Sequence, residues 1–113
     1  MRSVFGEIVL PPDTPATTAR VVHVEVRDVT VADAPSTVVA SRELHDVAVA
    51  PGARLPFAVD VPDVASQRRL NVRVHIDVTG SGSVSSGDYL TTESIVVPST
   101  GPSGPIAAPV RRV

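Results

Sequence analysis

The chain has 113 residues, 42% of them hydrophobic but only 3% aromatic, and a formal net charge of −2 from ten basic and twelve acidic residues. This length suits one domain with one core, and the near balance of charge excludes the basic field of a nucleic-acid-binding protein. No segment approaches the roughly 18 apolar residues that cross a bilayer, and the absence of cysteine excludes disulfides, thiolate metal sites and cysteine nucleophiles.

Seven runs of apolar residues predict short β-strands. Valine dominates these runs, and its β-branched side chain favours strands over helices. Eleven prolines and seven glycines separate the runs, which is typical of a β-sandwich or barrel with many turns. The predicted strands are 4–10, 20–29, 37–45, 54–61, 69–79, 91–97 and, in the tail, 106–113.

Two of these strands alternate almost without interruption. In 20–29, valines occupy one face while His23 and Glu25 occupy the other. In 69–79, apolar residues again occupy one face, and we expect the other face, with Arg73, His75 and Asp77, to point to water. The sequence does not decide which face of 4–10 is buried, because apolar residues occur on both sides of this strand.

The connections between strands are predicted from turn residues. Asp28, Asp33, Ala34 and Pro35 should shape the turn after the second strand, because aspartate bonds its own backbone and proline fixes φ. Residues 62–68 could form one helical turn. The Gly/Ser run at 80–87 is expected to be a mobile hairpin loop, and its spacing does not match a phosphate-binding loop.

Few residues suggest chemistry. If the strands 20–29 and 69–79 are neighbours, His23, His75 and Asp77 could form a surface Zn²⁺ or Cu²⁺ site, although ordinary cross-strand charge pairs explain the same residues. No serine lies in a Gly-x-Ser-x-Gly elbow, and no cluster of oxygen ligands suits Ca²⁺. We therefore expect no enzyme activity and no cofactor, and the hydrolase of a transthyretin-like fold is the least favoured class.

Several segments carry a family resemblance. The run DVTVADAPSTVVASREL at 28–44 resembles the characteristic segment of the YbaY/YscW family, small bacterial β-sandwich domains related to type III secretion pilotins. LPFAVDVP at 55–62, RRLNVRVHIDV at 68–78 and SSGDYLTTESIVV at 85–97 are similar to later strands of the same family. The resemblance covers about residues 4–97 and implies an envelope domain that binds another protein, with no catalytic residue set.

The chain also departs from the family. Many members carry an N-terminal signal and a lipidated cysteine, and this sequence shows neither. We therefore expect a periplasmic or cell-envelope location if a signal segment has been removed, and a cytoplasmic one otherwise.

The fold class that we predict is an all-β, immunoglobulin-like or transthyretin-like sandwich of about seven strands, with a single domain at 1–98 and a Pro/Gly-rich tail at 99–113. Its predicted function is non-enzymatic binding of a protein partner, for which the resemblance implies an envelope or secretion component. Weak alternation in 37–45 and the internal proline of 54–61 indicate edge strands, and unpaired edges are templates for strand addition. The candidate partner-binding residues are Val38, Val39, Ala40, Arg42 and Pro56. The alternative is the metal or small-molecule site on the histidine face.

Overall fold

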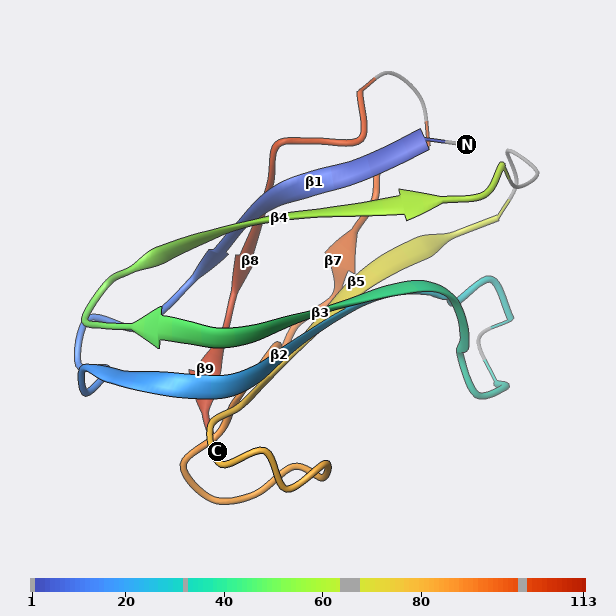
Figure 1. Ribbon diagram of the computed structural model, residues 1–113. Coiled ribbons are helices and arrows are strands. Elements are labelled where there is room, and N and C mark those ends of the chain that lie inside the picture. Colours follow the sequence, from blue (N-terminus) through green and yellow to red (C-terminus); the bar gives the residue numbers. More distant parts are fainter. Residues whose placement is uncertain (1, 32, 64–67, 100–101) are drawn as a thin grey trace.

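The computed structural model describes residues 2–31, 33–63, 68–99 and 102–113, which form strands and turns and no helix (Figure 1). No membrane-spanning helix therefore occurs in these ranges. The nine strands found in them are β1 (Arg2–Val9), β2 (Thr17–Asp28), β3 (Thr37–Val49), β4 (Arg54–Val61), β5 (Leu70–Asp77), β6 (Tyr89–Leu90), β7 (Ile95–Val96), β8 (Ile106–Pro109) and β9 (Arg111–Arg112). The predicted all-β class is confirmed.

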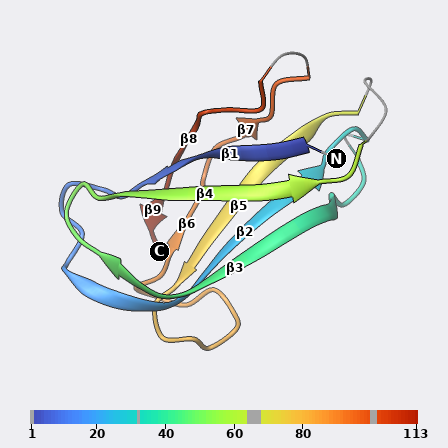
Figure 2. The same cartoon turned by 45° about the horizontal axis from the view of Figure 1, so that its top comes forward.

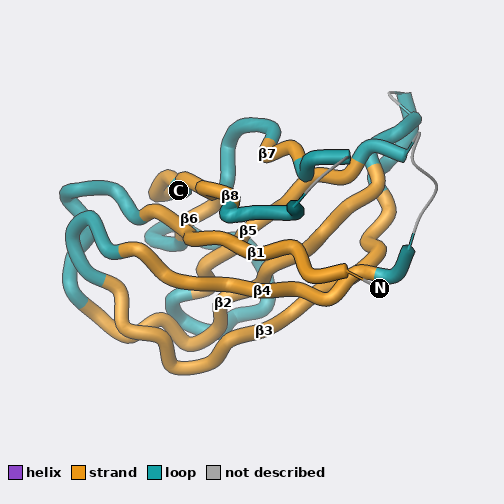
Figure 3. Tube along the Cα trace, turned by 90° about the horizontal axis from the view of Figure 1, so that it is seen from above, coloured by secondary structure: helices purple, strands orange, loops and turns teal. Residues whose placement is uncertain are grey.

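The strands form two sheets that pack face to face (Figures 2 and 3). One sheet has the order β4-β1-β8, in which β4 is antiparallel to β1 and β8 is parallel to it. The other has the order β3-β2-β5-β6-β9, and β7 also pairs with β5. The predicted sandwich is thus confirmed, whereas an immunoglobulin-like or transthyretin-like connectivity stays a prediction.

The core lies between the sheets and consists mainly of valine. Val24 on β2 lies opposite Val74 on β5, and both side chains are buried. On the facing sheet, Val59 of β4 lies opposite Val4 of β1 and is also buried. The period-two alternation of β2, β4 and β5 therefore places most of their valines inward, because successive strand residues point to opposite faces; Val21, next to the buried Val22, is the exception.

The structure resolves which face of β1 is buried. Val4 and Ile8 point into the core, while Phe5 on the other face is 39% exposed. Gly6 shares the inward register, but a Cβ there would overlap the backbone carbonyl of Ile106 on β8. Glycine at this position lets β8 approach β1 closely enough to pair with it.

The C-terminal third departs most from the predicted strands. The predicted strand 91–97 contains only the two residues of β7, because the polar residues Thr92, Glu93 and Ser94 lie exposed outside the ladder, although Thr91 still bonds Val74 of β5. The tail supplies β8 to one sheet and β9 to the other. The helical turn predicted for 62–68 falls mainly on residues 64–67, which lie outside the described residues.

Candidate protein-interaction site

The edges of the two sheets contain the residues that we predicted to bind a partner. Val38, Val39, Ala40 and Arg42 lie on β3, which in the described residues pairs only with β2. Pro56 lies on β4, whose recorded pairing is with β1. Both strands are edges, and they meet along one flank, where a guanidinium nitrogen of Arg42 donates to a backbone carbonyl of β4 (Figures 2 and 3).

The direction of the free backbone groups on β3 follows from the hydrogen bonds at the far side of its sheet. The N–H groups of Thr91 and Val97 donate to the carbonyls of Val74 and Leu70, so the even-numbered residues of β5 face away from β2. Backbone groups alternate in direction along an antiparallel strand. The odd-numbered residues of β5 therefore bond β2, and the even-numbered residues of β2 are left to bond β3.

The same alternation assigns the two sides of β3. Ala40 and Arg42 lie opposite Val26 and Val24 of β2, so their backbone groups point inward to the ladder. The N–H and C=O groups of Ser41 and Glu43 consequently point away from the sheet. These two residues form an open edge that another strand can extend.

The regular part of the β3 edge is limited at both ends. A β-bulge in the pairing of β2 and β3 occurs next to Val26 and Arg27. At the other end Asp46 has φ of 53°, a left-handed conformation that interrupts an extended strand. Such irregularities restrict indefinite edge pairing, so the open edge of β3 is short.

The β4 edge is blocked where the β3 edge is open. Phe5 donates its N–H to Ser103 and Val110 donates to Val9, so the odd-numbered residues of β1 face β8 and the even-numbered ones face β4. By alternation, the outward positions of β4 include Pro56 and Ala58. Proline has no N–H to offer, and the Ala58 carbonyl accepts the bond from Arg42 at 3.4 Å.

Two histidines and a glutamate lie together on the outer face of the β2–β3 hairpin. His23 Nδ1 lies 3.3 Å from one carboxylate oxygen of Glu43, and His45 Nε2 lies 3.6 Å from the other. The Glu43 side chain is 55% exposed, so these pairs contribute little to stability. They present a polar row beside the open edge.

The turn after β2 is built by Asp28. Its carboxylate accepts hydrogen bonds from the hydroxyl and the backbone N–H of Thr30 and lies 3.3 Å from Arg68. The hydroxyl and backbone N–H of Thr30, followed by the charge of Arg68, lower the pKa of Asp28. Ala34 donates to the Val31 carbonyl within the same turn.

The rest of this turn was also part of the prediction. Asp33 and Pro35 lie exposed in it, and no side-chain bond of Asp33 is recorded within the described ranges. A structural role for Asp28 fits these contacts, whereas the role of the other turn residues stays a prediction.

The predicted metal face is wrong in one respect: His75 and Asp77 do not face water. His75 is 6% exposed and Asp77 1%, because the loop that follows β5 folds over the end of the strand. His23 and His75 are direct cross-strand neighbours with stacked rings 5.5 Å apart. The described donor atoms close enough to hold a metal ion come from His75, Asp77 and Asp88, not from His23.

The two buried carboxylates already have protein donors. Asp77 accepts the backbone N–H groups of Gly80, Ser81 and Gly82 at 2.9 to 3.2 Å. Burial acts to raise the pKa of Asp77, but these three donors outweigh it and hold the pKa below its ordinary value. The carboxylate therefore braces the loop that was expected to be mobile.

The carboxylate of Asp88 holds the same loop at two further points. It accepts from the backbone of Val78 and Ser85, each at 3.0 Å, and lies 2.9 Å from His75 Nε2. A metal ion would have to displace these donors, so the metal alternative is not favoured. The sequence placed Asp88 in a turn but gave no sign that it is buried against His75, because the two residues are 13 positions apart.

Comparisons with known proteins agree with the fold. Residues 1–93 match the family model YscW, described as the type III secretion system lipoprotein chaperone. A solved structure described as an alternative pilotin from the type II secretion system of Vibrio cholerae aligns with a TM-score of 0.73 and 22% identity, over 99% of this chain and 98% of that one. No curated protein sequence matches. Since the family model covers most of the chain, the protein belongs to the YscW family.

Proposed function

We propose that this domain is a non-enzymatic interaction domain that binds a secretion or cell-envelope protein by strand addition at β3. Membership of a family described as secretion lipoprotein chaperones supports a protein-binding role. The protein of similar structure is described as a pilotin, which agrees with this role. The observation that carries the proposal is the open edge of β3, where Ser41 and Glu43 direct their backbone groups outward.

The choice of β3 over β4 rests on hydrogen-bonding capacity. An added strand gains affinity from main-chain bonds to the edge that receives it. On β4, Pro56 lacks a donor and the Ala58 carbonyl already has one from Arg42. The charged residues Arg42 and Glu43 on β3 limit nonspecific pairing and allow a partner to be selected by charge.

The experiment that tests this proposal is an affinity pull-down with the tagged domain from separated envelope and cytosolic fractions of the source cells. The baits are the wild type, Ser41→Pro, which removes one outward N–H, and Ser41→Ala, which keeps it. The proposal predicts an envelope protein that the wild type and Ser41→Ala retain and that Ser41→Pro binds about tenfold more weakly, equivalent to about 1.4 kcal/mol.

Circular dichroism and the urea midpoint of each variant establish that the baits are folded. Equal retention by a folded Ser41→Pro domain would contradict binding at the β3 edge. A wild-type domain that retains no envelope protein would contradict the proposed role itself.

A further inference from the structure

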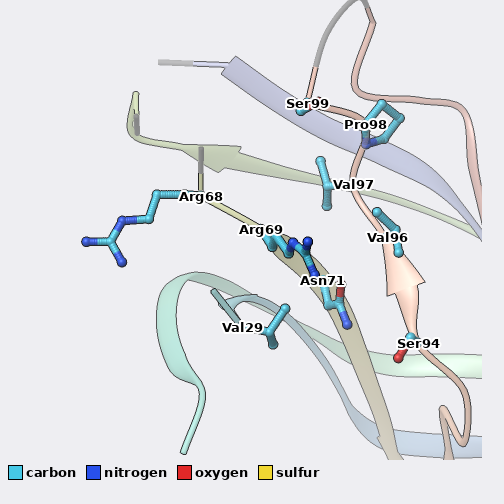
Figure 4. Close-up of a pocket in the computed structure, with 9 residues that line it drawn as sticks. All are labelled: Val29, Arg68, Arg69, Asn71, Ser94, Val96, Val97, Pro98 and Ser99. Carbon is cyan, nitrogen blue, oxygen red and sulfur yellow. The ribbon is translucent and has the colours of Figure 1, made fainter. Parts of the chain in front are cut away.

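A groove lies at the end of the sandwich where β5 begins. Its cavity measures ≈ 710 Å³, and its lining comes from the end of β2, the start of β5 and the segment around β7 (Figure 4). None of its described lining residues belongs to β3. The lining residues that matter for recognition are Arg68, Arg69, Asn71, Val96 and Val97.

The wall formed by the β7 segment is apolar and lightly held. Val96 is 66% exposed, more than any other large hydrophobic residue of the described chain. β7 pairs with β5 through two residues, with one further backbone bond from Val97 to Leu70. A second cavity of ≈ 560 Å³ borders the same segment and is lined by Val96, Ile106 and three prolines among others.

One cation in the groove has no counter-ion. Arg68 lies 3.3 Å from Asp28 and extends away from the other lining residues (Figure 4). Within the described ranges, no carboxylate oxygen lies within 4.0 Å of the Arg69 guanidinium. In Figure 4 that guanidinium lies beside Asn71, among the lining residues.

The backbone of Arg69 is fixed although its side chain is unpaired. Its N–H donates to the Thr30 hydroxyl at 2.9 Å, and its carbonyl accepts from Val29 at 2.8 Å. An unpaired guanidinium on a fixed backbone, in a groove that is also lined by the exposed Val96, is complementary to a carboxylate that is flanked by apolar side chains. Arginine is suited to this contact because it binds carboxylates in bidentate geometry and packs against apolar surface.

We infer that this groove is a second docking surface, which takes a segment of a partner protein that carries an Asp or Glu side chain next to apolar ones. The carboxylate pairs with Arg69, and the apolar side chains cover Val96 and the neighbouring valines. This inference goes beyond strand addition at β3, since it concerns different residues and a different chemistry of recognition.

The test uses a phage-displayed library of random 15-residue peptides, selected on the wild-type domain. The groove predicts enrichment of peptides that place an acidic residue within a few positions of large apolar ones. Their affinity should fall about tenfold or more on Arg69→Glu and on Val96→Asp. It should stay unchanged on Arg111→Glu, a charge reversal at an exposed residue of β9, and on Ser41→Pro at the β3 edge. Because Arg69 and Val96 are exposed, both groove variants should fold.

A charge exchange makes the test sharper. Replacing the acidic residue of an enriched peptide by lysine should weaken binding to the wild type and restore binding to Arg69→Glu. Failure to enrich such peptides, or equal binding by Arg69→Glu, would overturn the groove. Peptides whose binding is lost on Ser41→Pro and kept on Arg69→Glu would overturn the groove while leaving the β3 proposal intact.

Discussion

The two sides of the sandwich are held together by different means. The flank with β3 and β4 consists of strands of 13 and 8 residues, whereas β6, β7 and β9 on the other side have two residues each and β8 has four. Long alternating strands are held by repeated ladder bonds and by valine packing. The short strands depend on single contacts, such as the approach at Gly6 and the carboxylate of Asp77. Loss of one such contact on the side with the short strands should therefore cost more stability than loss of one side-chain contact on the flank with β3 and β4.

The largest effect is expected at Gly6, where a Cβ would overlap backbone atoms of Ile106. Gly6→Ala should lower the free energy of unfolding by about 3 kcal/mol, because β8 must move away from β1. Gly52→Ala is the matched control: Gly52 has φ of 63° but no atom near its Cβ position, so strain alone should cost about 1 kcal/mol. Urea unfolding measures both, and equal losses would contradict the close approach of β8.

The next effect compares two adjacent residues of β3. Ala40→Pro removes an N–H that points into the ladder with β2 and should cost about 2 kcal/mol of unfolding free energy. Ser41→Pro removes an outward N–H and should cost less than about 0.5 kcal/mol. Chemical denaturation of the two variants tests the orientation of the edge. The assignment is wrong if Ser41→Pro is the more destabilised of the two.

A smaller effect is expected at Asp77, whose carboxylate holds the loop after β5. Asp77→Asn replaces one carboxylate oxygen by an amide group that cannot accept the loop N–H groups, and it should cost about 1 to 2 kcal/mol at neutral pH. The folded-state pKa of Asp77 lies below the ordinary value of 3.8, so the unfolded chain takes up the proton first as pH falls. The stabilisation is therefore complete above about pH 4 and is lost as pH falls through the folded-state pKa.

Urea unfolding at pH 7 and at pH 3 checks this prediction. The difference between the wild type and Asp77→Asn should shrink at the lower pH. A difference that does not change with pH would show that the carboxylate charge contributes nothing to the brace.

The smallest effect is expected at Arg42, whose 3.4 Å bond to Ala58 is exposed. Arg42→Ala should change the unfolding free energy by less than about 0.5 kcal/mol. It should free the Ala58 carbonyl. The hydrogen exchange rates of the backbone amides in the sheets should not change, since the bond involves a side chain. A loss above 1 kcal/mol in thermal unfolding would mean that Arg42 holds the two sheets together.

The sequence predicts the long strands of the sandwich better than the short ones, for physical reasons. Alternation in β2, β4 and β5 identifies their buried faces, because burial on one face imposes period two. The edge position of β4 follows from Pro56, since proline cannot donate to a ladder. No comparable rule applies to two-residue strands, so the pattern does not predict that only Ile95 and Val96 of the segment 91–97 form a strand.

The burial and pairing of the site residues are also not predictable from local sequence pattern. His75 and Asp77 occupy polar positions of an alternating strand, and nothing local indicates that the following loop buries them. The pairing of His75 with Asp88 depends on a return of the chain that pattern cannot place. The isolation of Arg69 depends likewise on which carboxylates lie near it in space.

Amide hydrogen exchange along β3, with and without the envelope protein that the pull-down retains, tests strand addition most directly. Strand addition at β3 predicts that the outward amides of Ser41 and Glu43 exchange quickly in the free domain and slow strongly in the complex, while the inward amides of Ala40 and Arg42 are slow in both. Exchange at Ser41 and Glu43 that does not change on binding would contradict strand addition at β3.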